Sequence, residues 1–141
     1  DIGIGTTAPS AKLDVVGNVE VNGALVTPPS GTTTVTGTGQ TLSAPTRRVL
    51  KIQALTTGRG VSGIGAGADG QELIIINVGA QGVNMIGNLS PGSGTTGMTL
   101  GGESGAFSFS MGTSDTLHLI YDTNSNRWLE ISRSNNVPVI N

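Results

Sequence analysis

Residues 115–132, DTLHLIYDTNSNRWLEIS, indicate the fold class most directly. Over Leu117–Tyr121 the leucines and the tyrosine share one face, while His118 lies on the other, which is the period-2 pattern of a β-strand. The polar run Asp122–Asn126 supplies turn-forming residues, and a second strand follows at Trp128–Ser132. The stretch therefore predicts a β-hairpin.

Other short apolar runs separated by glycine extend this pattern upstream. The run ELIIINVG (residues 72–79) is continuously apolar, which predicts a strand buried on both faces. Further strands are predicted at Thr33–Thr36, Val49–Leu55, Leu73–Val78, Val83–Ile86 and Ala106–Phe109. Their spacing of roughly 8–14 residues favours a β-sandwich, a barrel or a jelly-roll-like unit.

The composition favours strands and self-assembly. The 141 residues include 23 glycines and no cysteine, 11% are charged, 3% are aromatic, and strand-forming residues outnumber helix formers. A hydrophobic fraction of 35% is low for a core completed by one chain. We therefore expect an intertwined homo-oligomer, because assembly supplies the missing core.

Charge and hydropathy exclude some partners. The net charge of −2 gives no basic surface for nucleic acid, and no apolar run approaches the ~18 residues of a membrane span, so neither nucleic-acid binding nor membrane insertion is expected. No signal peptide is visible.

The first 31 residues differ from the rest. In DIGIGTTAPSAKLDVVGNVEVNG (residues 1–23) apolar residues recur between small and polar ones, and ALVTPPSG (24–31) ends in a strong breaker. We predict a neck with a linker over 1–31 and a β-domain over 32–141. Because the chain starts at Asp1, we expect the end of a longer polypeptide, or a processed chain.

Two stretches resemble bacteriophage tail fibres: the segment IGIGTTAPSAKLDVVGNVEVNG, and the pair ADGQELIIINVGAQGVNMIG and DTLHLIYDTNSNRWLEIS. The resemblance covers roughly residues 1–23 and much of 68–132. It implies a parallel homotrimer in the virion, assembled in the host cytoplasm, with other tail proteins upstream and a trimeric β-module at the distal end. Many such fibres also carry a self-cleaving chaperone domain, which this sequence lacks.

In such a trimer, small and β-branched residues would face the common axis. The candidates for this shared core are Ile2, Ile4, Leu13, Val15, Val19 and Val21, with Trp128 as a residue of either the domain core or the subunit interface. Gly3 and Gly5 would permit close approach of the chains.

No set of residues predicts catalysis, a cofactor or a metal site. The sequence contains too few aromatic residues to build a sugar-cleaving groove around its carboxylates. Asp115 and Asp122 are predicted to form turns. GIGAGADG (63–70) lacks the helix of a phosphate-binding loop and is predicted to be a turn. His118 has two interpretations: three copies meeting at a trimer axis around a metal, or an ordinary exposed or hydrogen-bonded histidine.

Binding is expected on the loop at residues 87–105, because loops on a rigid scaffold usually carry recognition. The candidate receptor contacts are Asn88, Ser90, Ser93, Thr95, Thr96 and Glu103. By resemblance the ligand would be a host-surface polysaccharide. The expected function is a non-catalytic fibre that attaches to a host. The alternatives are a head fibre or capsid-decorating trimer, a bacterial surface adhesin or filament subunit, and, last, a polysaccharide depolymerase.

Overall fold

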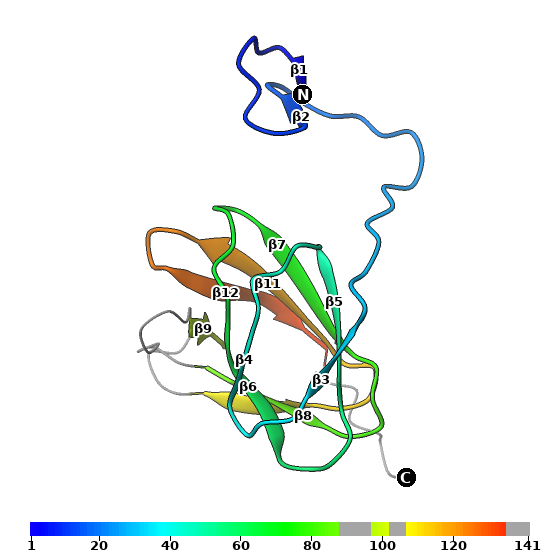
Figure 1. The fold of residues 1–141 in the computed structure, drawn as a ribbon, viewed down its shortest axis with the longest axis vertical. Coiled ribbons are helices and arrows are strands. Elements are labelled where there is room, and N and C mark those ends of the chain that lie inside the picture. The colour runs from blue at the N-terminus through cyan, green and yellow to red at the C-terminus, as the bar shows by residue number, and fades with distance from the viewer. Residues whose placement is uncertain (88–96, 102–106, 135–141) are drawn as a thin grey trace.

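A computed structural model of the chain describes residues 1–87, 97–101 and 107–134 (Figure 1). The strands are β1 (Ile2–Ile4), β2 (Leu13–Val15), β3 (Thr32–Val35), β4 (Gln40–Leu42), β5 (Val49–Ala54), β6 (Arg59–Ile64), β7 (Glu72–Asn77), β8 (Val83–Ile86), β9 (Gly97–Thr99), β10 (Ser108–Met111), β11 (Thr116–Asp122) and β12 (Arg127–Arg133). The described residues contain no helix, which confirms the all-β prediction.

Two sheets face each other around one core. One has the order β3-β5-β7-β11-β12-β9 and the other the order β10-β8-β6-β4. From β3 to β8 the chain alternates between the sheets, and each new strand pairs in parallel with the strand two before it. A jelly roll is antiparallel. The first six strands of the domain therefore form a parallel coil, which the sequence analysis did not anticipate.

The predicted C-terminal hairpin is confirmed. β11 and β12 pair in antiparallel register, with Tyr121 opposite Trp128 and an irregularity between His118 and Leu119. Leu117, Leu119 and Tyr121 point into the core, as the alternation predicted. β11 also pairs with β7, so the hairpin closes the parallel coil with antiparallel strands.

Strand β7 lies where the apolar run predicted it, but its burial differs. Leu73 and Ile75 are fully buried on the inner face, whereas Ile74 and Ile76 on the outer face remain partly exposed. The expectation of burial on both faces is wrong for the described chain, because the four-stranded sheet packs on the inner face of this strand and no described residue forms a layer on its outer face.

Three strands were not predicted: β4, β6 and β9. In β6, glycines break the apolar alternation that would have identified it. One of them, Gly60, is needed because a Cβ there would lie 2.8 Å from the Asn84 carbonyl oxygen on the neighbouring strand β8. Gly60 thus interrupts the apolar pattern in the sequence and also permits β6 to pair closely with β8.

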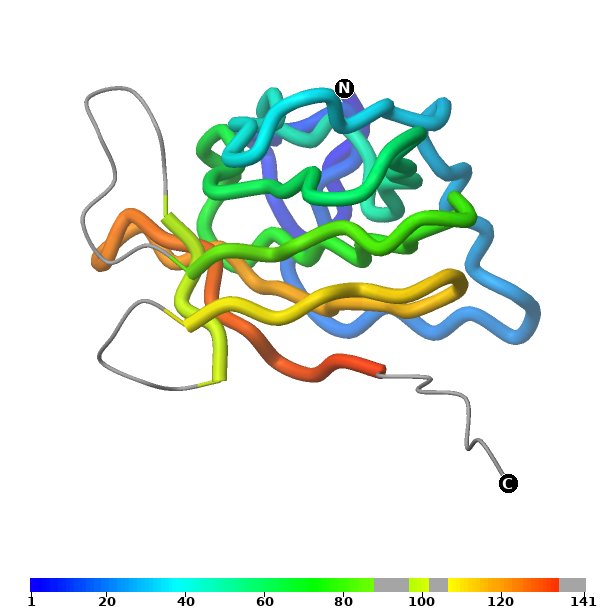
Figure 2. The backbone as a smooth tube through the Cα atoms, turned by 90° about the horizontal axis from the view of Figure 1, so that it is seen from below, coloured from blue at the N-terminus to red at the C-terminus, as the bar shows by residue number. Residues whose placement is uncertain are grey.

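A buried asparagine ties two turns together. Asn77 at the end of β7 donates from Nδ2 to the carbonyl oxygens of Gln81 and Met111, each at 2.9 Å, and its Oδ1 accepts from the Gly79 amide. Figure 2 shows the β7–β8 and β10–β11 turns side by side at one end of the domain. The side chain therefore holds the two sheets together at that end.

The neck contains the small parallel pair β1–β2 and then an extended segment that leads to the domain (Figure 1). The alternation of apolar and polar residues from Leu13 to Val21 predicts a strand, of which only Leu13–Val15 forms, as β2. Contact with the domain includes Ser30, whose amide donates to the Val49 carbonyl on β5.

Candidate functional surfaces

The neck exposes most of its apolar side chains. Five of the predicted shared-core residues have at least half of their surface exposed, and Val15 is partly buried; the five are Ile2 (64%), Ile4 (56%), Leu13 (59%), Val19 (68%) and Val21 (50%). Three further residues, not predicted, extend this set at 66–77%: Val16, Leu25 and Val26. We call residues 1–26 with these side chains the apolar neck.

Local hydrogen bonds shape the apolar neck. Ile2 and Val16 donate backbone bonds across the β1–β2 pair, and Asp14 accepts from both the amide and the hydroxyl of Ser10. These Ser10 bonds lower the pKa of Asp14. Gly5 adopts φ +75°, and a Cβ there would lie 2.7 Å from the Val16 carbonyl oxygen. Glycine at position 5 thus permits the close approach of two segments of the same chain, whereas the sequence analysis suggested close approach between different chains.

Trp128 belongs to the core of the domain. Its side chain is fully buried, its Nε1 donates to the Gly65 carbonyl at 3.0 Å, and its ring packs on Tyr121 with centroids 5.1 Å apart. Complete burial within one chain leaves no surface for a second chain. Of its two predicted environments, the structure shows the domain core.

The glycine-rich stretch 63–70 is the packing partner of that indole. A Cβ on Gly67 would lie 2.9 Å from two ring carbons of Trp128, and one on Gly65 would lie 2.4 Å from the Ala44 amide nitrogen. Glycine at position 67 lets the backbone lie directly on the tryptophan, and glycine at position 65 lets it lie close to Ala44. Only the end of the stretch is a turn, at Gly70 with φ +72°.

The predicted receptor contacts lie outside the described residues. These are Asn88, Ser90, Ser93, Thr95, Thr96 and Glu103.

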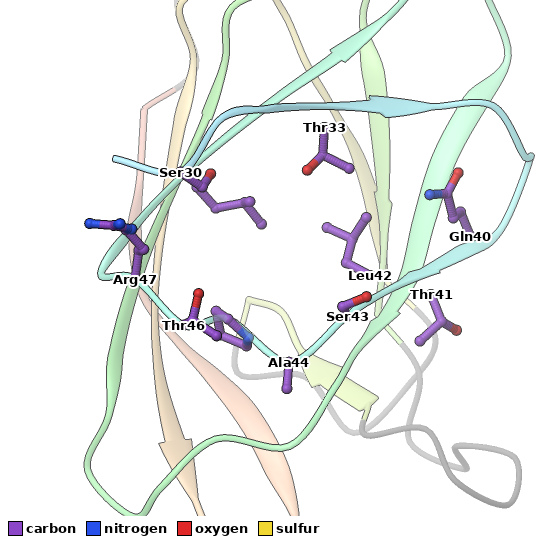
Figure 3. Close-up of a pocket in the computed structure, with 11 residues that line it drawn as sticks. Ser30, Thr33, Gln40, Thr41, Leu42, Ser43, Ala44, Thr46 and Arg47 are labelled. Atoms are coloured by element: carbon purple, nitrogen blue, oxygen red, sulfur yellow. The ribbon is translucent and has the colours of Figure 1, made fainter. Parts of the chain in front are cut away.

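A pocket of about 190 Å³ lies between β3, β4 and the segment that joins β4 to β5 (Figure 3). Its floor includes Leu42 and Leu50, and hydroxyl groups such as those of Thr33 and Thr46 line it. Arg47 lies at the rim with its guanidinium directed away from the centre (Figure 3). The hydroxyls can bond to a polyhydroxylated ligand, although the lining contains no aromatic ring on which a sugar could stack.

Carboxylates of the domain hold turns or ion pairs. Asp122 accepts from the amides of Asn124 and Ser125, and Asp69 accepts from the amide and hydroxyl of Thr123. The Ser125 bonds lower the pKa of Asp122. Asp115 accepts from the Gly112 amide at 2.7 Å. The prediction that Asp115 and Asp122 stabilise turns is confirmed.

Glu72 lies beside Arg48 and His118 on the outer face of the six-stranded sheet. Arg48 donates to Glu72 from Nε at 3.0 Å, and the pKa of Glu72 is lowered, mainly by this guanidinium. The Nε2 of His118 lies 3.5 Å from a Glu72 oxygen, is buried, and has no hydrogen-bond partner within the described part of the chain. His118 is thus partly covered beside a carboxylate.

Among residues 1–87, 97–101 and 107–134 there is no cluster of three or more histidine, cysteine or acidic side chains that could hold a metal ion. Those residues also include no helix long and apolar enough to cross a membrane.

Comparison with known proteins adds no identification. No family model, no curated protein and no solved structure matches this chain.

Proposed function

We propose that this chain is the distal part of a trimeric virion fibre, a bacteriophage tail fibre end that attaches to the host cell surface without catalysis. The apolar neck would be the end of the shaft, and the β-domain the terminal knob. The observation that carries this proposal is the exposure of eight large apolar side chains within residues 1–26.

Such exposure is costly for a lone chain. Burial is worth roughly 25 cal/mol per Å² of apolar surface, and large exposed apolar patches mark interaction sites. In one chain the β1–β2 part of the neck stands apart from the domain, and its apolar side chains remain uncovered (Figure 1). Parallel copies winding together would bury these side chains, and the sequence resemblance favours three copies.

The domain would supply recognition. Three knobs on one axis give avidity, so each contact with a surface polysaccharide could be weak. The hydroxyl-lined pocket is a described surface suited to such a ligand, in addition to the predicted contacts in residues 87–105.

Light scattering on residues 1–141 tests the assembly. We expect the mass of three chains for the wild type and of one chain for Val19→Asp with Val21→Asp, because buried charge opposes association. The matched control, Asn18→Asp with Asn22→Asp, adds the same charge at exposed polar positions and should remain trimeric. A monomeric wild type would overturn the proposal.

Adsorption to cells tests the function. Labelled trimer should bind bacterial cells and lose binding after their surface polysaccharide is removed. Copurification with capsids and no cell binding would assign the chain to the head instead, and long polymers would identify a filament subunit.

A further inference from the structure

The outer face of the six-stranded sheet is apolar at its centre. Register places Val49 beside Ile74, and Ile74 beside His118; in the next row Ile120 lies between Glu72 and Leu129. Ile131, at the irregularity in β12, is 52% exposed. We call Val49, Ile74, Ile76, Ile120, Leu129 and Ile131 the outer apolar face.

This face has no covering layer in the described chain. Every strand from β3 to β12 belongs to one of the two sheets, which meet on the opposite side. The outer face of a sandwich exposed to water is normally polar, and a strand that is apolar on both faces is normally covered on both. The alternate isoleucines of β7 thus indicate that something else covers Ile74 and Ile76.

We infer that the outer apolar face packs against the β-domain of a second copy of this chain. This inference rests on the proposed function, because the apolar neck would hold the copies close together. Ser30, at the end of the linker, bonds to β5 of this same sheet through its amide and its hydroxyl. Copies joined through the apolar neck would therefore meet near the end of this sheet where the linker enters.

The charges on this face also suit a second copy. Arg48 and Lys51 lie on β5 or just before it, and Glu72 lies on the neighbouring strand β7. Arg48 and Glu72 form an ion pair within the chain, so the apolar centre is bordered by both signs with little net charge, and a second copy of the same face can approach without strong repulsion. A strongly basic or strongly acidic partner would repel the charges of its own sign on this face.

His118 lies beside the outer apolar face. Its Nε2 atom is already buried within one chain, 3.5 Å from a Glu72 oxygen. We expect the interface to include this pair together with Arg48, which donates to Glu72.

Thiol labelling tests the inference, because the full chain contains no cysteine. Ile74→Cys is compared with Ile86→Cys, an isoleucine that is also partly exposed and lies on the outer side of the other sheet. Each rate of reaction with a bulky maleimide is divided by the rate in denaturant. In the assembled protein of residues 1–141 we expect Ile74→Cys to react about tenfold or more slowly than Ile86→Cys, because interface cores pack as tightly as protein interiors.

Ile120→Cys provides a second position if Ile74→Cys fails to fold, and light scattering on the same samples gives the oligomeric state. A trimer in which these positions react as fast as Ile86→Cys would overturn this inference and leave the proposed fibre standing. A monomer would overturn both.

Discussion

The neck and the β-domain use apolar residues in opposite ways. Within residues 1–26 eight large apolar side chains are exposed, whereas from residue 32 on the large apolar residues gather in one core and four of those described are exposed. The domain has the long-range strand pairing needed to enclose its side chains, and the neck has a single three-residue parallel pair. The domain core can therefore form within one chain, whereas the neck leaves its apolar side chains uncovered in one chain.

Removing the central aromatic residue should give the largest effect and should be confined to the domain. Trp128→Ala would leave a cavity between Tyr121 and the glycine-rich stretch 63–70, and we expect a loss of about 3–5 kcal/mol in the free energy of unfolding. Circular dichroism during urea unfolding measures this loss, since the mutation removes the sole tryptophan. Trp128→Phe should lose less. Equal losses from Trp128→Ala and from a neck substitution would contradict the separation of the two regions.

Adding one methyl group beside the indole should cause the next largest loss in the free energy of unfolding. Gly67→Ala would place a Cβ 2.9 Å from the ring of Trp128, so we expect overpacking to cost about 1–3 kcal/mol. Gly31→Ala is the matched control, because a Cβ there has no neighbour within 4 Å. If both variants unfold at the same urea concentration, the stretch 63–70 is not a packing element.

These glycines show what the sequence could and could not predict. Alternation identified β11 and β12 and short apolar runs identified β7 and β8, because their inward residues are apolar and their turns contain Asp, Asn and Gly. The parallel order was not predictable, since period-2 patterning assigns faces but does not choose the neighbouring strand. The packing of stretch 63–70 on Trp128 was missed for the same reason, because a contact between residues 65 and 128 leaves no local signal.

The candidate surfaces were predicted unevenly. The sequence singled out Ile2, Ile4, Val19 and Val21 as residues of a shared core, and the structure adds that they are exposed in one chain. The pocket was not predicted, since its lining combines residue 30 with residues 40–50, which only the pairing of separate strands brings together. The incomplete burial of β7 also required the topology, which shows that the described part of the chain forms no layer over the outer face of this strand.

The smallest expected effect is that of low pH on the melting temperature, and it should differ between the domain and the neck. The folded chain lowers the pKa of Glu72 from its ordinary 4.5, through Arg48, and that of Asp14 from 3.8, through Ser10. A carboxyl whose pKa is lowered by folding stabilises the folded state above its unfolded pKa, and this contribution is lost as the pH falls through the folded value. The melting temperature of the domain should therefore fall with the protonation of Glu72 at pH values below about 4.5.

Glu72→Gln should flatten that fall by no more than a few degrees, because the pair is partly exposed and screened by solvent. Asp14→Asn should leave the melting curve of the domain unchanged at every pH, since Asp14 stabilises only the loop between β1 and β2. Melting curves from about pH 6 to about pH 3 measure both variants. An Asp14→Asn curve that departs from the wild type as much as Glu72→Gln would mean that the neck and the domain unfold together, as they would if assembly couples them.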